Sequence, residues 1–443
     1  MNLTIEDINE TRKKLHVSFT SEEVEREQGK ILKDFSGHAR ISGFRPGKAP
    51  QSLIRQRYRK ELAEELDRKI TSLAYETAVK ESEMDIFAVI DLTKEEIKSG
   101  EEGDLTITVD INPDFDLPDY KEIPTEISST EVTDKEIDEA IHEFRRQRSS
   151  FEVVTRAAEI GDFIKVSYNG MIDNQPIADL VPDIKIYGKQ ENTWEEAGGE
   201  EGTGIKAVVD GLVGMNVDEE KEVEMEFPSD LPVEALAGKK AVYHMKVHEV
   251  RERVLPDIDE KLLGTMQMEN LDQFRNRVSD EIKASKDASN RNSQRQQIHD
   301  RLNEQIEFPL PESAVESETQ ALMRDLMAQN FRRGVSEQEM EKHKEEIFQN
   351  ARTAANDRVK MNLLLSKISE KESIAVDEKD IQQCLVREAI SSGSQPEKFI
   401  KEIRRDRDRL ASIHQSIRMN KTWDMLVEHS IVSTIEDDQK DGK

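Results

Sequence analysis

The amino-acid sequence predicts a multidomain α+β fold, and three observations support that prediction. The chain has 443 residues, too many for one hydrophobic core, and it fits about three domains. Strand-like alternation is mixed with helical spacing up to about residue 250, whereas helical spacing dominates from Pro256 onward. Hydrophobic and charged residues each make up 35% of the chain, so much of the helical part must be exposed.

Residues 1–111 are predicted to form an α+β unit. Leu15 to Phe19 alternate as a strand, and Thr20 with Glu23 forms a capping box that should start the next helix. A loop is expected over residues 36–50. The remaining predicted elements of this unit are helices over 51–62 and 64–81 and strands over 86–92 and 105–111.

Residues 112–150 are predicted to connect this unit to the next. The segment 112–125 combines Pro113, Pro118 and Pro124 with acidic residues, a composition typical of a linker. Thr133 and Glu136 then form a second capping box, which predicts a connecting helix that ends near residue 148.

Residues 151–250 are predicted to form a small antiparallel β domain. Apolar and polar residues alternate over 163–168, 223–227 and 241–247, and glycine, aspartate and asparagine residues separate these segments.

Residues 251–443 are predicted to be helical. One helix should run from Leu271 to Glu307, about 55 Å at 1.5 Å per residue, although residues 283–297 contain no large apolar side chain. We expect this polar middle to be exposed, because a helix without an apolar stripe has no face to bury. A return helix is expected from Glu312 through Phe331, another over 336–371, and shorter helices up to about residue 430.

The charge and the cysteine count exclude several classes of protein. A net charge of −29 argues against binding DNA or an anionic membrane with the molecule as a whole. The single cysteine, Cys384, permits no internal disulfide and no cysteine cluster for a metal. No secretory signal and no apolar stretch of about 20 residues is present. We therefore expect a cytoplasmic protein without a membrane or DNA partner, and without a metal or other cofactor.

A basic loop stands out in this acidic chain. Residues 35–60 contain seven lysines and arginines and no acidic residue. Basic side chains on a fixed loop suit phosphate groups and acidic protein surfaces, and an exposed phenylalanine adds an apolar anchor. The alternative is a solvated basic loop with its phenylalanine folded inward. The candidate binding residues are Gly43, Phe44, Arg45, Pro46, Gly47 and Lys48.

This loop resembles the ribosome-binding signature of the bacterial trigger factor family, Gly-Phe-Arg-x-Gly-Lys-x-Pro, at every fixed position. Residues 310–316 and 358–365 also resemble segments of that family. The resemblance implies a ribosome-binding domain over 1–111, a linker with a connecting helix over 112–150, an FKBP-type peptidyl-prolyl isomerase-like domain over 151–250, and an elongated helical chaperone domain with two arms over 251–443. The loop would contact ribosomal protein and RNA beside the exit tunnel.

The β domain departs from the isomerase pattern. Residues 166–170 resemble the opening strand of an FKBP-type domain, but aliphatic side chains stand at three positions where aromatic rings are usual. Residues 189–203 are predicted to form an extra polar loop. Isomerase activity therefore stays open against a spacer or weak binding role. The predicted apolar pocket for a prolyl ring consists of Tyr168, Ile177, Val208, Leu231 and Tyr243.

The helical region supplies the candidate surface for unfolded clients. Met323, Met327 and Phe331 lie on a helix with little to pack against, and methionine adapts to unlike partners. Core filling is the alternative for these residues.

The favoured function is an ATP-independent chaperone for nascent and unfolded polypeptides, with possible isomerase activity and with a free form that forms homodimers. The other hypotheses are a protein that is mainly a prolyl isomerase and a scaffold for one dedicated partner.

Overall fold

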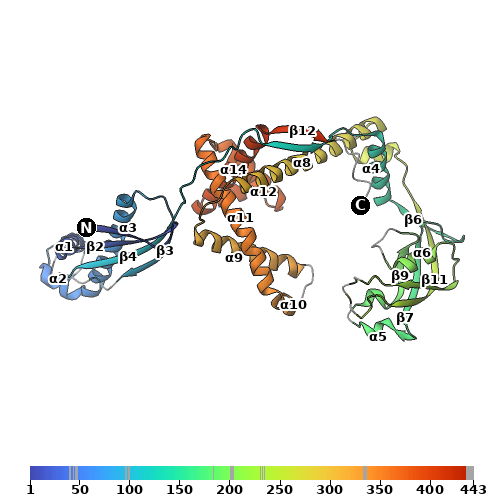
Figure 1. Ribbon diagram of the computed structural model, residues 1–443, viewed down its shortest axis with the longest axis horizontal. Helices are drawn as coiled ribbons and strands as arrows, with labels where there is room; N and C mark the ends of the chain where they lie inside the picture. Colours follow the sequence, from blue (N-terminus) through green and yellow to red (C-terminus); the bar gives the residue numbers. More distant parts are fainter. Residues whose placement is uncertain are drawn as a thin grey trace. The chain divides into compact units, whose positions relative to one another are not determined.

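The fold is α+β with a small antiparallel sheet and a helical C-terminal region, as the sequence predicts (Figure 1). The computed structural model describes all residues except 39, 40, 43, 45–47, 95, 96, 98, 99, 183, 200–203, 230, 232, 234, 333–336 and 436–443. The chain forms two compact units. The first comprises Met1–Ser129 with Ser289–Lys443, and the second comprises Thr130–Ala288.

The N-terminal part of the first unit is an antiparallel sheet with three helices. The sheet has the strand order β1-β2-β4-β3. Alternate residues of β2 point into the core, and α3 completes that core with an apolar residue at almost every fourth position. The elements are β1 (Asn2–Asp7), β2 (Arg12–Phe19), α1 (Ser21–His38), α2 (Gln51–Arg57), α3 (Arg59–Ser82), β3 (Ile86–Lys94) and β4 (Gly103–Ile111).

Both predicted capping boxes are confirmed. The backbone N–H of Thr20 donates to the Glu23 carboxylate over 3.1 Å, and the N–H of Glu23 donates to the Thr20 hydroxyl over 3.4 Å. Thr133 and Glu136 form the same reciprocal pair at the start of α4 (Asp134–Gln147). Two details of the N-terminal part were wrong: β1 was missed, and the helix break falls at Tyr58 rather than near residue 63.

The predicted linker over 112–125 is packed into the helical region. The ring of Phe115 stacks on Phe308 with centroids 4.0 Å apart. Tyr120 and Ile123 are buried in a core cluster with residues of the C-terminal helices. The segment ends in β5 (Pro124–Ser128), which pairs in parallel with β12 (Ile431–Ile435), a strand that the sequence analysis missed. Prolines and acids indicate an irregular backbone here, and the apolar residues between them fix that backbone to the helices.

The C-terminal region contains the predicted long helix and the predicted return helix. The second long helix is interrupted at His343, where the backbone leaves helical geometry, so the prediction of one helix over 336–371 was wrong. No helix in the described ranges is long and apolar enough to cross a membrane. The elements are α7 (Glu260–Thr265), α8 (Leu271–Gln305), α9 (Glu312–Arg332), α10 (Glu337–Lys342), α11 (Lys344–Lys371), α12 (Glu378–Ser391), α13 (Pro396–Ile403) and α14 (Arg407–Glu428).

The polar middle of α8 has a structural partner. The side-chain amide of Gln297 accepts from the N–H of Glu126 over 2.8 Å and donates to its carbonyl over 2.7 Å. Asn290 makes the same two bonds to Ser128. Gln294 is buried, so the expectation that this whole stretch is exposed was wrong there. These amides satisfy backbone groups of β5 that lack a strand partner.

The second unit contains the predicted antiparallel β domain. Its central strands follow the order β10-β11-β7-β8, with β6 beside β11 and β9 beside β7. Residues 189–196 form β9, so the prediction of a polar loop was wrong for that part of 189–203. The elements are β6 (Ser150–Val154), β7 (Phe163–Ile172), β8 (Gln175–Pro176), α5 (Ile177–Leu180), β9 (Lys189–Glu196), α6 (Lys206–Leu212), β10 (Glu220–Glu226) and β11 (Lys240–Val254).

Candidate functional site

The basic loop of the N-terminal part presents an exposed aromatic ring. The N–H of Phe44 donates to the carbonyl of Ile41 over 3.1 Å, and Ile41 packs against the core. The Phe44 side chain is 43% exposed, so it is not folded inward. Lys48 is also exposed. The other predicted loop residues, Gly43, Arg45, Pro46 and Gly47, lie outside the described residues.

Three described basic residues near this loop have no acidic partner among the residues that the structure describes. Lys48, Arg55 and Arg57 are exposed and form no ion pair with any described residue. The one ion pair described for this segment joins Lys60 to Glu64, with 3.9 Å between charged atoms. Such charges remain available to an anionic partner.

Helix α2 fixes the second half of this surface. Ile54 is fully buried and anchors the helix, whereas Leu53 beside it is 40% exposed. Sequence analysis missed Leu53, because an apolar pair at adjacent helix positions does not show which member is buried. The docking surface is defined here as Phe44, Lys48, Leu53, Arg55 and Arg57.

The β domain brings all five predicted pocket residues into one cluster. Tyr168, Ile177, Val208 and Tyr243 are buried there, and Leu231 packs against them while remaining partly exposed. The rings of Tyr168 and Tyr243 meet edge to face, with centroids 6.0 Å apart. The Tyr243 hydroxyl donates to the carbonyl of Tyr187 over 2.8 Å, so its polar end is satisfied inside an apolar interior.

Gly170 explains part of the sequence motif over 166–170. A Cβ atom at this position would lie 2.5 Å from the Tyr243 ring and 2.8 Å from the Ile177 side chain. No Cβ atom fits at such distances, so a glycine lets the strand approach the ring closely.

Two further aromatic residues belong to this cluster, and the sequence analysis did not select them. Tyr187 is partly exposed, Phe227 is buried, and their rings meet nearly perpendicular with centroids 5.6 Å apart. Phe227 directly follows the alternation of β10, which could have indicated its burial. Both rings pack in the same hydrophobic cluster as the five predicted pocket residues.

The cluster contains one acidic group with an altered pKa. Burial raises the pKa of Glu195, despite hydrogen bonds from Thr193 and Tyr168 that lower it. Burial and the neighbouring Glu195 carboxylate raise the pKa of Tyr168. Burial thus disfavours the charged form of each group.

The third candidate site lies on the hairpin of α9 and α11. Small residues bring the two helices together, since Ala351 and Ala355 on α11 are buried against α9. The predicted client residues differ in exposure: Met323 is partly buried, Met327 is 40% exposed and Phe331 is 76% exposed.

The spacing of these residues gathers them on one side of α9. Positions four residues apart share a helix face. Phe348 on α11 is a further exposed aromatic residue, 36% exposed, that the sequence analysis missed.

The second unit contains an apolar groove between α4 and the first half of α8. Its volume is about 570 Å³. Phe274 and Val278 form its buried floor, and the guanidinium of Arg148 lies 3.9 Å from the centre of the Phe144 ring at its edge. Two methionines, Met266 and Met268, complete the lining, so the groove can adjust its shape.

Comparisons with known proteins give a consistent result. A family model described as bacterial trigger factor protein matches residues 1–144, and a model of the C-terminus of the same family matches residues 270–428. Trigger factor from Opitutus terrae is 41% identical over 437 residues, covering 98% of this chain and 99% of the relative. Trigger factor from Akkermansia muciniphila is 27% identical, covering 95% and 97%. A solved structure titled "Promiscuous Substrate Recognition in Folding and Assembly Activities of the Trigger Factor Chaperone" covers 97% of this chain with 20% identity and a TM-score of 0.48.

Proposed function

Because the chain belongs to the trigger factor family of ribosome-associated chaperones, we propose that it docks on the ribosome through the docking surface and shields newly made chains without ATP. One observation carries this proposal. An exposed Phe44 lies near Lys48, Arg55 and Arg57, which pair with no acid among the described residues, within a chain of net charge −29. This combination suits a surface that contains both RNA phosphates and protein.

The acidic remainder of the chain gives the docking its orientation. Ribosomal RNA repels a negatively charged body, so the basic segment is the part that approaches the ribosome. The protein acts in the cytoplasm, where nascent chains emerge.

Cosedimentation with ribosomes tests the docking. The Phe44→Ala/Lys48→Ala variant should stay in the supernatant at salt concentrations where the unchanged chain pellets. Phe87→Ala/Lys80→Ala is the matched control, because it removes an exposed ring and an exposed lysine from the same part of the molecule. Equal pelleting of the two variants would count against docking at this surface.

Client binding is assigned to the exposed apolar residues of the α9–α11 hairpin and to the groove of the second unit. Met327, Phe331 and Phe348 offer apolar area that no other described element covers. A segment of unfolded chain gains about 25 cal/mol for each Å² of apolar surface that it buries there. The same contacts suit many sequences, because they require apolar character and not a defined shape.

Prolyl cis/trans isomerisation is the second candidate function. It is supported by the convergence of Tyr168, Tyr187 and Tyr243 with the aliphatic pocket residues in one cluster. Such a site would favour the twisted amide over the planar one, against a barrier of roughly 18–20 kcal/mol for rotation about the peptide bond.

A refolding assay limited by proline isomerisation tests this second function. The unchanged chain should accelerate the slow phase, and Tyr168→Ala should remove that acceleration while prevention of aggregation is retained. Absence of any acceleration by the unchanged chain would leave the β domain as a spacer.

A further inference from the structure

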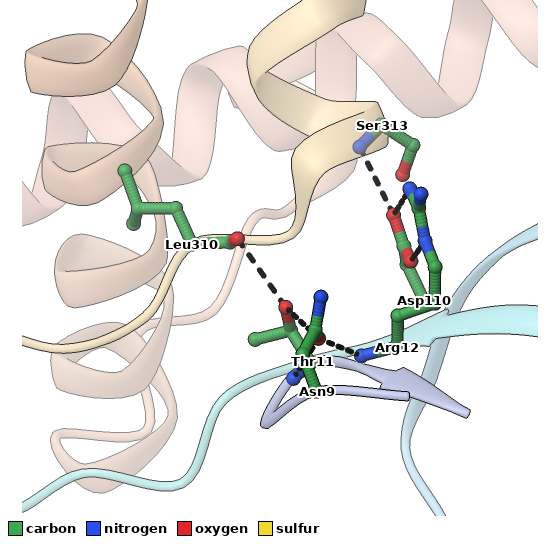
Figure 2. Close-up of polar contacts among 6 residues, drawn as sticks. All are labelled: Asn9, Thr11, Arg12, Asp110, Leu310 and Ser313. Atoms are coloured by element: carbon green, nitrogen blue, oxygen red, sulfur yellow. Dashed lines mark hydrogen bonds and ion pairs between the residues drawn. The ribbon is translucent and has the colours of Figure 1, made fainter. Parts of the chain in front are cut away.

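A buried carboxylate joins the N-terminal sheet to the start of α9 (Figure 2). Asp110 stands on β4 opposite Arg12 on β2, and its side chain is fully buried. The Nε atom of Arg12 donates to one Asp110 oxygen over 2.6 Å, and Nη2 donates to the other over 3.0 Å. This bidentate pair lies wholly within the N-terminal part and orients the carboxylate.

The same carboxylate also caps a helix. The backbone N–H of Ser313, in the first turn of α9, donates to Oδ2 of Asp110 over 3.0 Å. First-turn N–H groups have no partner inside their own helix, and Pro311 immediately before α9 has no side-chain oxygen to accept from them. Asp110 therefore supplies from the sheet the negative cap that the helix lacks locally.

A second hydrogen bond crosses beside the first. The hydroxyl of Thr11 donates to the carbonyl of Leu310 over 3.3 Å. The side-chain oxygen of Asn9 holds the turn before β2 by accepting from the N–H groups of Thr11 over 2.9 Å and Arg12 over 2.7 Å. Figure 2 shows how this turn aims Thr11 at Leu310 while Asp110 faces Ser313.

Charges at the beginning of α9 act in the same direction. The pKa of Arg12 is raised, first by its hydrogen bond to Asp110 and, to a smaller extent, by the carboxylates of Glu312 and Glu316. The cation is thus attracted by the sheet and by the helix at once.

We propose that Asp110, Arg12 and Thr11 form a releasable latch that holds the N-terminal sheet against the start of the α9–α11 hairpin. Two hydrogen bonds, from Ser313 to Asp110 and from Thr11 to Leu310, connect the two parts, and two such bonds contribute only a few kcal/mol together. When the latch opens, Asp110 keeps Arg12 as its partner, so no buried charge is stranded. The N-terminal part that contains the sheet also carries the docking surface, on α2 and the loop before it, and the hairpin carries the exposed apolar residues, so the latch would couple their positions.

The latch can be tested on the free full-length chain, independently of ribosomes and clients. Spin labels at the exposed positions Glu81 and Glu346, in a Cys384→Ser background, report the distance between sheet and hairpin by pulsed electron paramagnetic resonance. Asp110→Ala removes the cap. Ser313→Pro removes the donated N–H together with the Ser313 hydroxyl and leaves every residue of the sheet unchanged, and proline is tolerated in the first turn of a helix. Asp104→Ala, an exposed change on the same strand, is the control.

The unchanged chain and the Asp104→Ala control should show one narrow distance distribution. Both latch variants should broaden it, and hydrogen exchange at the Ser313 amide should become at least tenfold faster in Asp110→Ala. Broadening in Asp110→Ala could also arise from unfolding of the N-terminal sheet. Ser313→Pro excludes that explanation, because Ser313 is not part of the sheet. Narrow, unchanged distributions in both latch variants would overturn the proposal, as would equal broadening in the control.

Discussion

The β domain and the α9–α11 hairpin use large and small residues in opposite ways. In the β domain large rings fill the interior, and Tyr243 is completely buried. In the hairpin the buried contact between helices combines alanines with aliphatic residues and contains no aromatic ring, whereas Phe331 is 76% exposed. The difference shows that exposed apolar residues in the hairpin do not hold the fold together. They are free to serve binding, whereas those of the β domain must serve stability as well.

The largest expected effect tests the interior of the β domain. Tyr243→Ala removes a buried ring and its hydrogen bond to Tyr187, and it should lower the free energy of unfolding of this domain by about 3–5 kcal/mol. Urea unfolding followed by the fluorescence of Trp194, on β9 of the same sheet, measures the loss. A loss under 1 kcal/mol would show that the interior is not closely packed around this ring.

The next effect tests the small residues of the hairpin. Ala355 is fully buried between α11 and α9, and Ala355→Leu should destabilise the hairpin by about 1–3 kcal/mol, because added methylene groups have no space. Ala354→Leu at the neighbouring exposed position is the control. Thermal unfolding measures the stability of both variants. If Ala355→Leu were as stable as Ala354→Leu, the close approach of α9 and α11 at Ala355 would not be needed for stability.

A smaller effect separates binding from stability. Phe331→Ala should change the free energy of unfolding by less than about 0.5 kcal/mol, because the side chain is exposed. It should weaken the binding of an unfolded client about tenfold, which corresponds to about 1.4 kcal/mol of lost contact. Fluorescence anisotropy of a labelled unfolded protein measures the affinity. Unchanged affinity would remove Phe331 from the client surface.

The smallest effect is a dependence on pH in the β domain. Burial raises the folded-state pKa of Glu195 above its ordinary value of 4.5. The folded state therefore binds more protons than the unfolded state just above that value, and stability should fall as the pH rises through the interval up to the folded pKa. Urea unfolding from pH 4 to 7 should show a smaller slope for Glu195→Gln. Identical slopes would exclude this carboxyl as the cause.

Local signals in the sequence predicted local structure well. The Thr20–Glu23 and Thr133–Glu136 boxes marked two helix starts correctly, because a capping box depends on residues three positions apart. The five residues of the predicted pocket lie in one hydrophobic cluster, and their role in binding a prolyl ring stays a prediction from the family resemblance. The exposure of Phe44 could not be decided from its neighbours alone.

Long-range partners explain the errors. Tyr120 and Ile123 lie among prolines and acids, and their burial depends on helices about 180 to 300 residues later in the chain. Strand β12 has apolar residues but no turn signal, and only its pairing with β5 defines it. Asn290 and Gln297, in the polar middle of α8, bind the backbone of β5. The sequence could not predict these bonds, because side-chain amides on an exposed helix bind water equally well.

The pairing of β5 with β12 has a consequence for the biosynthesis of this protein. Thr125 and Ser433 are 308 residues apart, yet the hydroxyl of Ser433 donates to the carbonyl of Thr125 over 3.3 Å. Translation proceeds from the N-terminus, so β5 is made about 300 residues before its partner strand. Contacts of such sequence separation form slowly. The pairing of β5 with β12 therefore forms only after residue 435 has been made, well after β5 itself.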